Sequence, residues 1–179
     1  MATQHIKRPI ISAGDADYIL TTTDMTTAGS QATMTNDNLP WGPGKLELSK
    51  SSTGAAVVYL TYKRASGAVI TEEKHSFTAA SGTYTDHEVA DLETVRWEAL
   101  AENLTIGQIT KLWFYIGDEY TGNDDGVYAC FCQVSNSSCP KIATKDTNWG
   151  YDEATKCAWI LVSAITSNAT DVIFNVLKQ

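Results

Sequence analysis

Short runs of β-type residues, separated by turn residues, constrain the fold of this chain more than any other feature. The run from Ala55 to Arg64 is apolar on both faces, as a central strand would be. Ala65-Ser66-Gly67 then supplies a short turn, and the run from Ala68 to Phe77 has a polar middle, which is typical of an edge strand. Together these segments predict a β-hairpin.

Further runs of the same kind follow later in the chain, at Lys111–Ile116, Val127–Val134, Cys157–Thr166 and Val172–Leu177. Turns join them rather than crossover helices, so we expect antiparallel sheets. A mainly β chain of this kind is best closed as an antiparallel β-sandwich or a jelly roll, because both limit exposed edges. Apolar residues on both faces of Lys111–Ile116 also predict that the protein self-associates.

One segment fits a helix, with Asp91 at its start and Asn103 at its end. Its apolar residues at helical spacing are Trp97, Leu100, Ala101 and Leu104. The segment also alternates as a strand would, at Val95, Trp97, Ala99 and Ala101. We expect one short helix at about residues 91–103.

Residues 1–40 are rich in threonine, carry little apolar periodicity, and contain Pro9 and Pro40 near their ends. They predict an extended N-terminal arm around one short strand, Asp17 to Thr22, followed by a β-sandwich domain of residues 41–179. Such an arm can add as a strand to the sheet edge of a neighbour. The side chains expected to anchor it in that partner are Ile10, Ile11, Tyr18, Ile19 and Leu20.

The charge balance restricts the partners. The 13 Lys and Arg residues are outnumbered by 21 Asp and Glu residues, and the formal net charge is −8. This is the opposite of the basic stripe that nucleic-acid-coating proteins and polybasic membrane binders use. No run of about 18 apolar residues is present. No apolar leader follows Lys7 and Arg8, so we expect synthesis in a cytoplasm, with neither nucleic acid nor membrane as a partner.

Catalytic motifs are missing from the sequence, which lacks the patterns of serine hydrolases, phosphate-binding loops and zinc proteases. His5, His75 and His87 are scattered, and we expect them at the surface. The protein is therefore predicted not to be an enzyme.

The four cysteines are Cys130, Cys132, Cys139 and Cys157. No C-x₂-C pair occurs among them, so we expect no metal and no other cofactor. Cys130 and Cys132 share one face of a predicted strand, and a disulfide from either later cysteine to that strand stays open.

Two acidic loops remain as candidate sites. Asp118 to Asp125 offers oxygen ligands but lacks the order of an EF-hand, so a solvated loop is favoured over a Ca²⁺ site. In the second loop, Trp149, Tyr151 and Asp152 could form a platform for a sugar. The alternatives are that the two aromatic rings pin the loop onto the sandwich or lie in a subunit contact.

The layout of the whole chain resembles that of tailed-bacteriophage accessory structural proteins of the head-decoration or cement class. The shared features are the start Met1-Ala2-Thr3 without a leader, a Thr/Ser/Ala/Gly-rich arm, an acidic balance, and a β domain that ends on a strand. The resemblance implies a structural virion protein that clamps capsid subunits, with itself and a major capsid or other virion protein as partners. A tail-tube subunit is the nearest alternative, and a carbohydrate-binding or adhesin module is the other.

Overall fold

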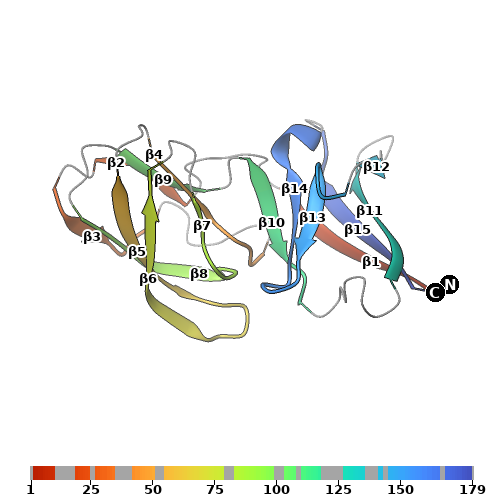
Figure 1. Ribbon diagram of the computed structural model, residues 1–179, viewed down its shortest axis with the longest axis horizontal. Helices are drawn as coiled ribbons and strands as arrows, with labels where there is room; N and C mark the ends of the chain where they lie inside the picture. Colours follow the sequence, from red (N-terminus) through yellow and green to blue (C-terminus); the bar gives the residue numbers. More distant parts are fainter. Residues whose placement is uncertain are drawn as a thin grey trace.

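The computed structural model describes residues 2–10, 19–24, 27–34, 42–50, 55–78, 83–98, 103–107, 110–117, 127–135, 141–142, 145–165 and 168–178. In these segments the chain is built from antiparallel strands arranged in four sheets (Figure 1). The predicted fold class, mainly β with antiparallel sandwich packing, is confirmed. The sheets pair into two sandwiches, each around its own hydrophobic core.

The first sandwich occupies the left half of Figure 1. One of its sheets has the order β2 (Leu20–Asp24), β9 (Asn103–Gly107), β4 (Glu47–Lys50), β7 (Thr83–Tyr84). The other has the order β3 (Gly29–Gln31), β8 (Asp91–Trp97), β5 (Ala56–Lys63), β6 (Val69–Phe77). Side chains from both sheets fill the core between them, among them Leu48, Leu60, Tyr62, Val95 and Ile106.

The second sandwich combines the end of the chain with its beginning. Its larger sheet has the order β1 (Ala2–Pro9), β15 (Asp171–Lys178), β11 (Val127–Ser135), β12 (Lys141–Ile142). The smaller sheet has the order β10 (Lys111–Tyr115), β14 (Cys157–Leu161), β13 (Trp149–Asp152), and a short 3₁₀ turn, Val162–Ala164, follows β14. β1 pairs with β15 from Ala2↔Lys178 to Pro9↔Asp171, which places both ends of the chain together (Figure 1).

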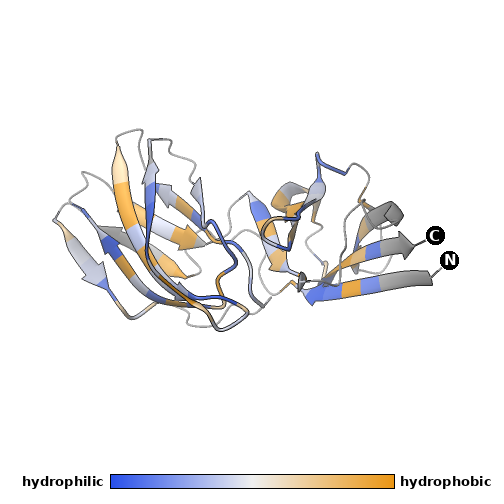
Figure 2. Cartoon of the chain, turned by 60° about the horizontal axis from the view of Figure 1, so that its bottom comes forward, coloured by the Kyte–Doolittle hydropathy of each residue, from blue (hydrophilic) through white to orange (hydrophobic). Residues whose placement is uncertain are grey.

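Strand β5 shows why these sequences form sheets. Its burial alternates residue by residue, with Val58, Leu60 and Tyr62 facing the core. The predicted hairpin to β6 is confirmed: the Arg64 amide donates to the Ala68 carbonyl at 2.8 Å, and Gly67 takes the positive φ of 84° that the turn requires. Hydrophobic residues recur along the strands of both halves in Figure 2, as two separate cores require.

The helix expected at about residues 91–103 is wrong. Residues 91–97 form β8, and β9 begins at Asn103. β8 hydrogen-bonds to β5 on one side and to β3 on the other, which satisfies its backbone on both edges. Val95 and Trp97 therefore face the core by strand alternation, and this pairing outweighs the helical spacing of the same residues.

The interpretation of residues 1–40 as one extended arm is also corrected where the structure describes them. β1 belongs to the second sandwich, whereas β2 and β3 belong to the first. Ile19 is 2% exposed and Leu20 is fully buried, both in the core of the first sandwich, so neither side chain is available to anchor in a partner. Ile10 packs against the second core. The Ile11 and Tyr18 positions lie outside the described residues.

Candidate functional site at the junction of the two sandwiches

The two sandwiches meet on the outer face of the β10-β14-β13 sheet. In β10, Leu112 and Phe114 face the second core, so Trp113 between them points outward. Its ring lies 5.8 Å from that of Tyr84 in the first sandwich, in an edge-to-face arrangement. We call this contact the junction; it is formed by residues 43–47 and Tyr84 of the first sandwich and by residues 110–115 and 152–157 of the second.

Backbone atoms of the two halves touch directly at the junction. The Tyr115 amide donates to the Pro43 carbonyl at 2.6 Å. Gly44 is bridged to Val89 on its own side, and a Cβ atom added to it would lie 2.1 Å from the Trp113 carbonyl oxygen. Only glycine permits this approach, because any side chain would occupy the space that the neighbouring backbone fills.

A buried carboxylate ties the two halves together beside this contact. Glu47 is 2% exposed, and its Oε2 accepts hydrogen bonds from both the amide and the hydroxyl of Thr110, each at 3.1 Å. The Thr110 hydroxyl also lies 2.6 Å from the Tyr84 hydroxyl. Burial raises the pKa of Tyr84, so its phenol stays protonated as a hydrogen-bonding group.

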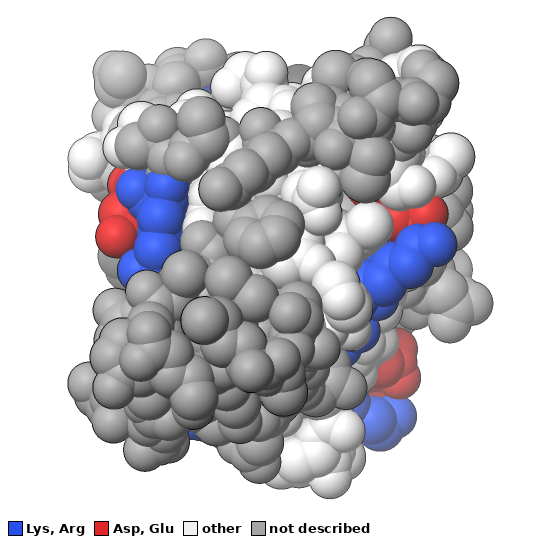
Figure 3. Space-filling view, turned by 90° about the vertical axis from the view of Figure 1, so that its right-hand side faces the viewer, with Lys and Arg blue, Asp and Glu red and all other residues white. Residues whose placement is uncertain are grey.

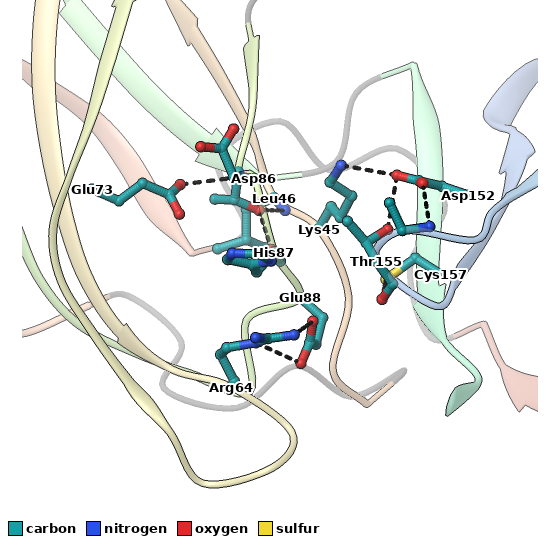
Figure 4. A network of polar contacts seen from close by, with 12 residues as sticks. Lys45, Leu46, Arg64, Glu73, Asp86, His87, Glu88, Asp152, Thr155 and Cys157 are labelled. Atoms are coloured by element: carbon teal, nitrogen blue, oxygen red, sulfur yellow. Dashed lines mark hydrogen bonds and ion pairs between the residues drawn. The ribbon is translucent and has the colours of Figure 1, made fainter. Parts of the chain in front are cut away.

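An ion pair closes the other side of the junction (Figure 4). Lys45 Nζ lies 3.4 Å from Asp152 Oδ2, which also accepts from the Thr155 hydroxyl at 2.8 Å. Burial acts to raise the pKa of Asp152, but the bond from Thr155 and the charge of Lys45 outweigh it and hold that pKa below its usual value. Next to them Cys157 is fully buried, and burial raises the pKa of its thiol to about 12.

A fork-shaped ion pair supports the first sandwich next to the junction (Figure 4). Arg64 Nε and Nη2 donate to the two carboxylate oxygens of Glu88, each at 3.1 Å. The Glu88 side chain is 1% exposed, whereas that of Arg64 is 29% exposed. The arginine therefore neutralises a buried acid while its own charge keeps contact with water.

A third buried carboxylate, that of Glu73, belongs to strand β6. Glu73 accepts a hydrogen bond from the Tyr62 hydroxyl, lies 2.5 Å from His75 Nε2, and accepts from the Asp86 amide at 3.1 Å. His75 is 5% exposed, so the expectation that it lies at the surface is wrong. In the part of the chain that the structure describes, His87 Nδ1 is buried without a hydrogen-bond partner.

One part of the junction reaches the surface. The Trp159 ring, from β14, is half-buried and lies 6.2 Å from the Trp113 ring. It lies across Gly150 of β13, where an added Cβ would be 2.7 Å from three indole atoms. Sequence reasoning missed Trp159. The available signal was Gly150 within one strand, next to a strand in which Trp159 alternates with core residues.

The predicted site residues Trp149, Tyr151 and Asp152 do not form one surface. Trp149 is 2% exposed in the second core, with its ring 6.2 Å from that of Phe174, and Tyr151 packs against the same core. A sugar therefore has no access to the Trp149 ring, which corrects the predicted platform. Asp152 instead belongs to the junction.

The remaining predicted sites carry little chemistry in the described structure. Cys132 and Cys157 are buried free thiols, while the Cys130 side chain, Cys139 and the whole Asp118–Asp125 loop lie outside the description. Within the described ranges, no three His, Cys, Asp or Glu side chains are grouped to hold a metal ion. Nor does any helix in those ranges have the length and apolar character needed to cross a bilayer.

Comparison with known proteins adds no family. No protein-family model, no curated protein and no solved structure matches this chain. The functional argument therefore rests on the geometry of the junction and of the surfaces around it.

Proposed function

We propose that the protein is a structural virion component that binds and stabilises a capsid lattice through contacts with itself and with a major capsid or other virion protein. The junction is the observation that carries this proposal. A protein that clamps a lattice must transmit force from one contact to the next without bending. Direct backbone contact at Gly44 and the buried acid Glu47 join two sandwiches into one stiff body that suits this task.

The outer face of the β3-β8-β5-β6 sheet supports the proposal as a contact surface. Arg96 stacks on the Tyr59 ring at 3.8 Å and pairs with Glu72 on the next strand but one. Lys63 pairs with Glu93 at 2.8 Å and with Asp91 at 3.2 Å. Tyrosine and arginine are the side chains that contribute most often to binding energy at protein interfaces, and held side chains lose little entropy on binding.

Charge on the opposite end of the molecule also fits a protein partner. Figure 3 looks at the end of the second sandwich, and the described Lys and Arg side chains seen there lie beside Asp or Glu side chains. In the same sandwich, Lys7 of β1 pairs with Asp171 of β15 at 3.1 Å. Mixed charge of this kind matches a protein surface better than the repeated phosphates of DNA.

The test is the composition of purified particles. Mass spectrometry of particles banded from the source culture should find this chain in fixed proportion to the shell protein. Separate head and tail fractions decide between a capsid decoration protein and a tail subunit. Absence of the chain from both fractions would overturn the proposal.

A surface variant tests the contact face itself. Arg96→Glu should weaken co-sedimentation with shells that lack the protein, because it reverses a charge on the proposed face without touching either core. Lys145→Glu makes the same charge change on a turn of the second sandwich and should leave co-sedimentation unchanged. Equal binding by both variants would remove this face from the lattice contact.

A further inference from the structure

The Trp159 indole is held as a platform on the outside of the second sandwich. Its neighbours Ala158 and Ile160 face the core, so alternation directs Trp159 outward. Gly150 has no side chain, and the indole lies over the backbone there instead of standing away from the sheet. An aromatic ring held flat at a surface is the shape on which the C–H face of a sugar ring stacks.

The ammonium group of Lys111 stands over this ring. Lys111 Nζ lies 3.9 Å from the centroid of Trp159 and 5.7 Å from that of Trp113. Among the described residues no carboxylate lies within ion-pair distance of it, although the chain carries 21 Asp and Glu residues. Among the described residues the ammonium group contacts the two rings and no acid, so its charge is available to an incoming anion.

Two hydroxyl groups belong to the same junction. The exposed Thr110 precedes Lys111, and its hydroxyl lies 2.6 Å from that of the half-buried Tyr84. Tyr84 comes from the first sandwich and Trp159 from the second, with the buried Trp113 ring between them. The Tyr84 hydroxyl therefore joins this surface only when the junction is assembled, whereas Trp159 and Lys111 lie on the paired strands β14 and β10 of the second sandwich.

We propose that Trp159 and Lys111 form a binding site for an acidic sugar of the uronic acid class. The Lys111 side chain is flexible and swings its ammonium group off the Trp159 indole. The pyranose ring of the sugar then stacks on that indole, and the carboxylate of the sugar pairs with the ammonium. An acidic peptide would satisfy the ammonium but would gain little from a flat indole, so the sugar fits both features. This site goes beyond the virion role and does not depend on it.

Tryptophan fluorescence titration with a galacturonic acid trisaccharide tests the proposal, with the methyl ester of the same trisaccharide as the uncharged control. The wild-type protein should bind the acid about tenfold more tightly than the ester. Lys111→Gln should abolish that preference, whereas Lys74→Gln, a matched change at an exposed lysine of β6, should keep it. Trp159→Ala should weaken binding of both sugars by about tenfold, measured by calorimetry.

Three outcomes would overturn the proposal. The first is no binding of the acid at about 10 mM, a concentration that exceeds the Kd of even weak specific sites. The second is polyglutamate binding as tightly as the acidic sugar with no effect of Trp159→Ala, which would indicate an acidic peptide site. The third is an acid preference that survives Lys111→Gln. If circular dichroism shows that Trp159→Ala does not fold, Lys111→Gln alone decides.

Discussion

Gly44→Ala should separate the two sandwiches while leaving both cores intact. The added Cβ would lie 2.1 Å from the Trp113 carbonyl oxygen and 2.9 Å from its carbonyl carbon, and all three atoms belong to backbone or are fixed to it. The bridge to Val89 holds Gly44 from the other side. The junction must therefore open by about 1 Å to restore ordinary contact distances.

The cost follows from this displacement. The bond from the Tyr115 amide to the Pro43 carbonyl, now 2.6 Å, would be lost, which costs about 1 kcal/mol. Overpacking at the contact adds about 1–3 kcal/mol. A total of about 2–4 kcal/mol corresponds to a Tm lower by about 5–15 °C in a protein of this size.

Calorimetry and near-ultraviolet circular dichroism provide the assay. Wild-type unfolding should show one transition, and Gly44→Ala should show two, because the cores no longer stabilise each other. The dichroism signal of Trp113 and Trp159 should fall before the first transition. Gly67→Ala is the control: its φ of 84° costs about 1–2 kcal/mol of strain, but no atom lies within 4 Å of the added Cβ. A single transition in Gly44→Ala, at or above the Tm of Gly67→Ala, would refute the reasoning.

Three more expectations follow from the buried groups. Arg64→Met should lower the free energy of unfolding, measured in urea, by about 3 kcal/mol, because it leaves the Glu88 carboxylate buried and unpaired. Replacing both Arg64 and Glu88 by methionine should cost less. Equal costs for the single and the double variant would argue against the ion pair. Burial acts to raise the pKa of Glu73, but its three hydrogen-bond donors outweigh burial and hold that pKa below 4.5. The stability it contributes is therefore present above about pH 4.5 and is lost as the pH falls through the folded value; Glu73→Gln should flatten this acid slope, and an unchanged slope would contradict the assignment. The Cys157 thiol, with its pKa raised to about 12, should resist alkylation at pH 8 until the protein unfolds; rapid labelling of the folded chain would show that it is not buried.

Local sequence patterns were sufficient where the partner strand is close in the chain. Alternation in Ala56–Lys63 and the turn at Gly67 predicted the β5–β6 hairpin, because both strands and the turn lie within one short stretch. The same reasoning misassigned residues 91–97, whose apolar residues fit both a helix and a strand. Hydrogen bonds to strands β3 and β5 decided in favour of the strand, and neither partner is adjacent to it in the sequence.

The candidate site, too, could be predicted from the sequence only in part. The sequence indicated that an aromatic and acidic segment near residue 150 carries specific contacts, but it selected Trp149 rather than Trp159. Strand alternation alone does not say which face of a sheet meets a core and which meets a neighbouring sandwich. That choice depends on the β10-β14-β13 register, which sets Trp159 opposite both Trp113 and Gly150.

The sequence by itself determined an antiparallel β protein of acidic charge, since alternation, turn residues and composition are local properties that act wherever the chain goes. Only the tertiary structure decided that there are two cores, that the first strand closes the second of them, and that Gly44 joins the halves. β1 pairs with a strand about 170 residues away, from Ile6 opposite Phe174 outward. Such a pairing leaves no periodic trace in either segment, because its free energy comes from burying both against a core that forms only when the distant parts of the chain meet.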